Sequence, residues 1–321
     1  MNRNLFLRCL PLGLLAFASW AHAYPDRPIK LVVPWATGGS TDALARAVGQ
    51  RMSETLGQEV LVENRPGAAG TVGIGQVAKA SADGYTLAII ELPHAIAPAV
   101  LAKLPYELER DFVPISLIGT SALVLFTNPA QAGHGNLAGL LTEARAKPGT
   151  VVLAHSGNGS LSHLAGELLQ QRAGVKFNLV PYRGSGPALT DLAGGIVAGH
   201  FATLASASAL LSGARIQAVA VAAERRLPLM SQLPTLAEQG VKDMVLEQWW
   251  GLVAPVGTPP KAIERIRREL HAALSHPSVS ERLRVLSIEK QPTSGEDFAR
   301  FIRSESTRWQ QVAREAGLKP E

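Results

Sequence analysis

The chain has 321 residues, of which 46% are hydrophobic and 18% charged, with one cysteine and a formal net charge of +5. A single cysteine excludes a disulfide framework, so the fold must rest on its apolar cores, and the length is sufficient for two α/β lobes. The basic residues form no concentrated face, which argues against nucleic-acid binding and is compatible with a protein that handles small anions.

The first 23 residues have the pattern of a cleavable export signal. Arg3 and Arg8 give a positive start, residues 10–20 are apolar, and residues 21–23 (AHA) form a small-residue cleavage site. The apolar run is too short to span a bilayer, and no later run is long enough. Cleavage leaves 298 residues (321 minus 23), removes Cys9, and lowers the net charge to +3 (29 Lys and Arg minus 26 Asp and Glu). We therefore expect a periplasmic protein without disulfides.

A loop rich in glycine and hydroxyl residues follows the first predicted strand. The strand covers residues 29–33, the loop residues 34–42 (PWATGGSTD), and the helix after it has apolar residues at every fourth position. The first N–H groups of a helix have no partner within it, so such a loop can bind a carboxylate or phosphate. An ordinary capped turn explains this single stretch equally well.

The rest of the chain alternates between strand and helix patterns, which predicts an α/β fold. Residues 112–127 are strand-like with a break at Gly119 and form the first crossing between two lobes, and residues 248–255 form the return crossing. Three helices end the chain, and the apolar stripe of the last, interrupted by Glu305, is expected to pack on the first lobe. Further strands are predicted at 59–63, 85–90, 151–154, 175–180, 196–201 and 216–222, and a further helix at 137–146.

Two more loops repeat the arrangement of strand, glycine and hydroxyl residues, and helix. They are residues 155–163 (HSGNGSLSH) and 181–187 (PYRGSGP). Three such loops at successive strand ends are harder to explain as ordinary turns than one. The strand at 85–90 ends in residues 91–94 (ELPH), at the same expected edge as the first loop. Ligands of open α/β sheets bind outside the carboxyl ends of the strands, so His94 is a site candidate, although a lone histidine is more often structural.

No catalytic, metal or cofactor motif emerges. Residues 70–75 have the spacing G-x-x-G-x-G, which does not fit a dinucleotide-binding turn, and the histidines lack metal-ligand spacing. A pairing of Ser156 or Ser160 with His163 leaves a hydrolase as a minor alternative. We expect a protein that is not an enzyme and uses neither cofactor nor metal.

From residue 24 onward the sequence resembles the solute-binding proteins of tripartite tricarboxylate transporters, the TctC or Bug family. The resemblance implies an α/β, two-lobed type II periplasmic binding fold, with two Rossmann-like domains joined by a double-stranded hinge. One lobe would comprise residues 24–122 and 250–321, and the other residues 123–249. The matching stretches are 24–29, 34–42, 62–68, 83–87, 104–106, 111–115, 156–167, 180–195 and 251–259.

The resemblance also implies that a carboxylate lies in the cleft between the lobes, held mainly by main-chain N–H groups and hydroxyls. Asp42 is expected to begin a helix rather than to contact the ligand. Carried over to this chain, the ligand-binding residues are Gly38, Gly39, Ser40, Thr41, Ser156, Asn158, Gly159, Ser160, His163, Gly184 and Ser185. The full set of predicted ligand-binding residues adds Trp35, His94 and Thr203.

Two stretches depart from the family pattern. Residues 91–93 (ELP) replace a loop rich in Gly, Asn and Thr, which puts an acid near the mouth of the site. Residues 197–203 (VAGHFAT) lack both aspartates of the usual V-D-x-M-F-D-N. With those acids missing, and Glu91 expected in the other lobe, where its side chain could face either toward or away from the pocket, we predict a ligand without an ammonium group, such as a dicarboxylate or an aromatic acid.

These observations predict a monomeric periplasmic protein that captures a small carboxylate and presents it to the membrane subunits of a tripartite tricarboxylate transporter. A ligand sensor that docks on a signalling receptor would need the same pocket, so that alternative stays open.

Overall fold

The computed structural model describes residues 24–131, 133 and 135–315, so the predicted export signal lies outside the described residues. Within the described part, ten strands form one continuous sheet, in the order β2-β1-β3-β9-β4-β7-β5-β6, with β8 and β10 also paired to β4. The strands are β1 Ile29–Val33, β2 Val60–Asn64, β3 Thr86–Glu91, β4 Phe112–Thr127, β5 Val152–His155, β6 Asn178–Pro181, β7 Gly199–Ala202, β8 Gln217–Ala222, β9 Glu247–Pro255 and β10 Glu289–Lys290.

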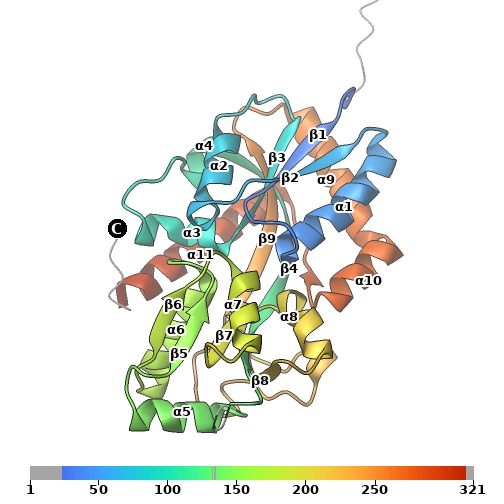
Figure 1. Ribbon diagram of the computed structural model, residues 1–321. Coiled ribbons are helices and arrows are strands. Elements are labelled where there is room, and N and C mark those ends of the chain that lie inside the picture. Colours follow the sequence, from blue (N-terminus) through green and yellow to red (C-terminus); the bar gives the residue numbers. More distant parts are fainter. Residues whose placement is uncertain (1–23, 132, 134, 316–321) are drawn as a thin grey trace, which may run out of the picture.

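The first part of the sheet contains β2, β1 and β3 in parallel, followed by the antiparallel β9 and β4. Successive residues of β1 face opposite sides, so Leu31 and Val32 belong to two different apolar cores. Helices α1, α9 and α10 contribute to the core on the Leu31 side, and α2, α3 and α11 to the other (Figure 1). The helices of this part are α1 Ser40–Leu56, α2 Thr71–Ala78, α3 Leu92–Val100, α4 Leu108–Asp111, α9 Pro260–Ser275, α10 Pro277–Val285 and α11 Gly295–Glu315.

The second part of the sheet contains the parallel strands β6, β5 and β7, with β4 and β8 antiparallel to their partners. It lies below the first part in Figure 1. Two of the strands predicted here begin later than expected, at Asn178 and Gly199. Ile196 remains 67% exposed, so it gains nothing from joining the sheet. The helices of this part are α5 Leu137–Ala146, α6 Leu161–Ala173, α7 Ser185–Ala193 and α8 Leu204–Ser212.

Strand β4 connects the two parts without interruption. Its partner changes from β9 to β7 and β8 between Ala122 and Leu123. The expected break at Gly119 is therefore wrong. The strand continues through a register shift between Leu117 and Gly119, where a side chain would collide with β10, since an added Cβ would lie 2.6 Å from the Glu289 carbonyl oxygen. The glycine serves strand pairing rather than a turn.

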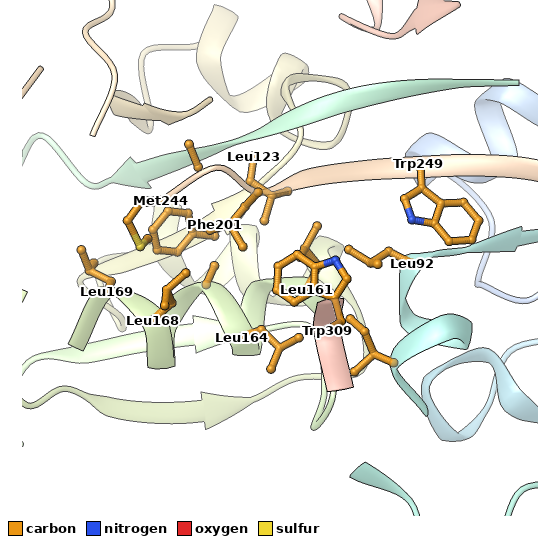
Figure 2. Close-up of a cluster of buried hydrophobic side chains, with 14 of the residues drawn as sticks. Leu92, Leu123, Leu161, Leu164, Leu168, Leu169, Phe201, Met244, Trp249 and Trp309 are labelled. Carbon is orange, nitrogen blue, oxygen red and sulfur yellow. The ribbon is translucent and has the colours of Figure 1, made fainter. Parts of the chain in front are cut away.

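The last helix, α11, contributes three fully buried apolar residues to the core, Phe298, Ile302 and Trp309. Glu305, which interrupts the apolar stripe, lies between two indoles: its Oε2 accepts from Trp249 Nε1 (3.2 Å) and Trp309 Nε1 (3.1 Å). The same apolar cluster includes leucines of α6, and Figure 2 shows Trp309 beside Leu161 and Leu164 of that helix. Helix α11 thus contacts the core of the first part where that core meets the second part.

Candidate functional site

A cavity of about 700 Å³ lies where the loops of the two parts of the sheet face each other. All three loops predicted from the sequence reach it. They follow β1, β5 and β6, whose carboxyl ends open toward the cavity, in agreement with the usual position of ligands in open α/β sheets. The lining residues that matter for the argument are Trp35, Gly38, Gly39, Ser40, Thr41, Glu91, Ser156, Ser160, Ser162, Tyr182, Arg183, Gly184, Ser185, Thr203, Ser206 and Gln248.

Four helices, α1, α6, α7 and α8, begin at the wall of this cavity. Helix α6 is capped by Ser160, which accepts from the His163 N–H (3.2 Å), and α8 by Thr203, which accepts from the Ser206 N–H (3.3 Å). Helices α1 and α7 begin after Gly39 and Gly184, and neither has a side-chain cap. The partial positive charge of four helix ends, two of them with free N–H groups, makes the cavity a seat for an anion.

The start of α1 is organised by Asp42. Its Oδ2 accepts from the Gly38 N–H (3.0 Å) and from Arg46 Nε (3.0 Å), and its Oδ1 accepts from Asn64 Nδ2 (3.0 Å). Burial alone would raise the pKa of Asp42, but these hydrogen bonds outweigh it and hold that pKa below its usual value. The Gly38 N–H is therefore occupied. The first helical hydrogen bond of α1 runs from the Ala43 N–H to the Gly39 carbonyl (3.0 Å). The N–H groups that lie between Gly38 and Ala43 in the chain are left for a ligand.

In the loop after β5, Ser162 holds the backbone in place. Its hydroxyl oxygen accepts from the Ser156 N–H (2.9 Å) and also lies within hydrogen-bond distance of the Ser156 and Ser160 hydroxyls (2.8 and 3.1 Å). Ser162 was not among the predicted ligand-binding residues, although it lines the cavity. A serine in the first turn of a helix is such a common structural residue that its sequence position carries no separate signal.

His163 faces away from the cavity. Its Nδ1 accepts from the Gly159 N–H (3.2 Å), its Nε2 lies 3.7 Å from Glu167 Oε1, and its ring stacks on His155 with centroids 4.3 Å apart. Neither ring nitrogen therefore faces a serine hydroxyl as a general base would. The Gly159 N–H is engaged by His163, and Asn158 is exposed. Three predicted residues therefore do not line the cavity, namely Asn158, Gly159 and His163.

The third loop contributes Ser185, whose hydroxyl is oriented by a buried histidine. His200 Nδ1 lies 2.9 Å from the Ala154 carbonyl, so this nitrogen carries the ring proton, and Nε2 accepts from the Ser185 hydroxyl (3.2 Å). Burial lowers the pKa of His200 to about 4, which keeps the ring neutral near neutral pH. The Ser185 proton is thus engaged, and its oxygen remains as an acceptor on the cavity wall. Arg183, exposed beside it, is the basic side chain among the described lining residues.

Glu91 lies in the cavity wall and is 3% exposed. Its Oε1 accepts from Trp35 Nε1 (2.9 Å) and from the Thr41 hydroxyl, and its Oε2 accepts from the Gln248 side-chain amide. Burial raises the pKa of Glu91 to about 7, against the effect of these hydrogen bonds. The direction of Glu91, which the sequence leaves open, is inward, because these donors hold the carboxylate inside.

The Thr41 hydroxyl belongs to this same network. It donates to Glu91 and accepts from Trp250 Nε1 (2.9 Å), so it has no proton left to offer a ligand. Thr41 is one of the predicted residues that line the cavity, but its side chain holds Glu91 in place.

His94 does not line the cavity. It is fully buried, and its Nδ1 accepts from the Glu91 N–H (2.9 Å). Burial lowers the pKa of His94 to about 4, so the ring is neutral. The ring packs near Trp35 and Tyr106, with centroids 6.4 and 6.5 Å away. His94 supports the loop that carries Glu91 from behind, which is the structural role that a lone histidine more often has.

Of the predicted ligand-binding residues, ten line the cavity and four do not. Those lining it are Trp35, Gly38, Gly39, Ser40, Thr41, Ser156, Ser160, Gly184, Ser185 and Thr203, and the others are His94, Asn158, Gly159 and His163. No group of three His, Asp or Glu side chains in the described part of the chain is arranged to hold a metal ion. None of the helices there combines the length and apolarity that a membrane crossing requires.

Comparison with known proteins gives matches over nearly the whole chain. Residues 44–318 match the family model described as "TctC: Tripartite tricarboxylate transporter family receptor". Protein BugT from Bordetella pertussis is 37% identical over 301 residues, which cover 93% of this chain and 92% of BugT.

Two solved structures with bound acids are similar to the whole fold. Rpa4515 of R. palustris with adipate is 34% identical, with a TM-score of 0.89, covering 93% of this chain and 100% of that one. MatC of Rhodopseudomonas palustris with bound malate is 31% identical, with a TM-score of 0.84, covering 90% and 99%. The chain therefore belongs to the tripartite tricarboxylate transporter receptor family, the TctC or Bug family of periplasmic solute-binding proteins, which are not enzymes.

Proposed function

We propose that this chain is a periplasmic receptor that captures a small carboxylate in the cavity and delivers it to the membrane subunits of a tripartite tricarboxylate transporter. The observation that carries the proposal is the convergence of four helix N-termini, two without caps, on one cavity. The export signal predicted in residues 1–23 accords with the periplasmic location of the family.

For the ligand, we propose a dicarboxylate or an aromatic acid. One carboxylate occupies the uncapped helix ends, and Arg183 is placed to attract a second from the solvent side of the cavity. A volume of about 700 Å³ accommodates acids of this size. The adipate and malate bound by two relatives support the same class.

Capture would involve closure of two lobes, residues 24–122 with 250–321 and residues 123–249. The two parts of the sheet are connected by β4, whose partner changes at Ala122, and by the segment before β9, where the Leu123 N–H donates to the Leu246 carbonyl (2.9 Å). Two adjacent crossings of this kind form a short hinge. The protein needs only one chain for this, so we propose a monomer.

A thermal-shift screen of mono-, di- and tricarboxylates tests ligand capture. A ligand at about 100 times its Kd stabilises the fold by roughly 2.7 kcal/mol, a readily measured shift. Failure of every acid to stabilise the protein would overturn the proposal. Uptake of the identified acid by cells with and without the gene then tests delivery: unchanged uptake would favour the sensor instead.

A further inference from the structure

The Glu91 carboxylate is buried in the cavity wall without a positive partner. Its three donors, Trp35, Thr41 and Gln248, are neutral. No Lys, Arg or His in the described part of the chain forms an ion pair with it. A buried carboxylate is poorly compensated by neutral donors alone, so a further donor brought by a ligand would stabilise it.

The hydrogen bonds also show where the carboxylate can accept more. From side chains, Oε1 accepts from Trp35 and Thr41, whereas Oε2 accepts from Gln248, and a carboxylate oxygen can accept two hydrogen bonds. Glu91 also belongs to the capping box at the start of α3. Because Glu91 lines the cavity, a donor on a ligand can approach this carboxylate. The second acceptor on the wall is Ser185, whose proton is engaged by His200. The cavity thus combines anion-binding helix ends with acceptors that require a donor.

We propose that the bound acid carries a hydrogen-bond donor, a hydroxyl or an ammonium group, which contacts Glu91, and that Glu91 selects such acids over their unsubstituted analogues. This inference rests on the proposed function, since it assumes that a carboxylate occupies the helix ends. Above its pKa of about 7, Glu91 is ionised, and a second ionised carboxylate placed against it would bring like charges together in a desolvated site. A simple diacid is therefore disfavoured there at a pH above this value, which is the condition for the binding test. The predicted exclusion of an ammonium group rested mainly on the two aspartates missing from residues 197–203, and the inward-facing Glu91 supplies an acid that this prediction did not count on.

Calorimetry with matched ligand series tests the inference. The series are succinate, malate and aspartate; glutarate, 2-hydroxyglutarate and glutamate; and benzoate with 4-hydroxybenzoate. In each series the skeleton is constant and only the donor changes. We expect a substituted member to bind about tenfold to a hundredfold more tightly than its parent, as for a hydrogen bond to a charged group. If the hydroxyl member binds more tightly than the parent acid, the donor is a hydroxyl group; if the amino member does, the donor is an ammonium group.

The variant Glu91→Gln keeps the size of the side chain and removes its charge. In this variant the substituted acid should bind at most a few-fold more tightly than its parent acid. The parent acid should bind to the variant at least as tightly as it binds to the wild type. Glu281→Gln is the matched control, because it makes the same change on α10, outside the cavity, where Glu281 pairs with Arg284, and it should leave the preference unchanged.

A melting curve of each variant confirms that it is folded. Equal binding of parent and substituted acids by the wild type, or an unchanged preference in Glu91→Gln, would overturn the inference and leave carboxylate capture intact. Failure of every acid in every series to bind would overturn both.

Discussion

The ring of Phe298 on α11 occupies the space that a side chain at Gly251 on β9 would need. A Cβ added at Gly251 would lie 1.8 Å from Phe298 Cζ. Both Phe298 and Trp309 of the same helix are buried, and Trp249 of β9 meets the Phe298 ring edge to face with centroids 6.0 Å apart. The absence of a side chain at position 251 thus allows the last helix to dock on the sheet.

Gly251→Ala should therefore destabilise the protein by about 3 kcal/mol or more, at the upper end of the cost of overpacking, because the ring cannot move without displacing α11. Chemical denaturation measures the change. The control is Gly213→Ala at the end of α8, where the nearest atom is 3.7 Å away and the added methyl has room. Similar losses from both substitutions would contradict the packing argument.

Gly39→Val separates binding from stability. Gly39 has φ −78°, and an added Cβ would meet only the Ala36 carbonyl oxygen, 4.0 Å away, so the fold accepts the side chain at a cost of about 1 kcal/mol or less. In the cavity, however, the branched side chain blocks approach to the first N–H groups of α1. We expect carboxylate affinity to fall at least about tenfold by calorimetry. Unchanged affinity would mean that the loop is an ordinary turn.

Two serines of the loop after β5 should respond differently to truncation. Ser160→Ala removes the cap of α6 and should lower the free energy of unfolding by about 1 kcal/mol. Ser162→Ala removes the acceptor of the Ser156 N–H and should chiefly weaken binding, by about tenfold, because the loop loses its geometry. Ser208→Ala, on the exposed face of α8, is the neutral control. If Ser162→Ala left affinity intact, the loop would be held by other contacts.

The stability of Glu91→Gln relative to the wild type should depend on pH. The folded pKa of Glu91, about 7, lies above the ordinary 4.5, so between these values the folded state binds more protons than the unfolded state. The contribution of Glu91 is then fully present below about pH 4.5 and lost as the pH rises through 7. The stability difference should shift in favour of the variant by about 3 kcal/mol between about pH 4.5 and 8. Denaturation curves that differ by a constant amount would disprove the raised pKa.

Closure of the two lobes predicts a smaller radius of gyration with ligand bound. Small-angle scattering of the protein with and without a saturating acid measures it. The wild type in sodium chloride of the same ionic strength serves as the unliganded control. An unchanged radius in the wild type would count against a hinge at Ala122 and Leu246.

The sequence was sufficient to predict most elements and three of the loops at the cavity, because apolar periodicity and glycine-hydroxyl stretches are local signals. It could not predict the orientation of Glu91. The hydrogen bonds that turn this carboxylate inward come from Trp35 and from Gln248, which is 157 positions away in the chain. The role of Ser185 likewise depends on His200, which lies on a different strand. Such contacts are set by tertiary packing and leave no local pattern.

Helices α1 and α7 begin at Gly39 and Gly184 without a side-chain cap, so in the ligand-free protein each forgoes a capping interaction, at a cost of roughly a few tenths of a kcal/mol relative to a capping residue. A bound carboxylate acts there as a removable capping residue. An aspartate introduced at Gly39, where φ is −78°, would be a permanent occupant, competing with the ligand from within the same molecule. Gly184 has φ 112° and ψ 171°, a conformation that strains any side chain, so no capping residue can replace it without cost. Improvement of the ligand-free fold and retention of binding are therefore opposed at Gly39, and stabilising substitutions are better sought elsewhere in the chain.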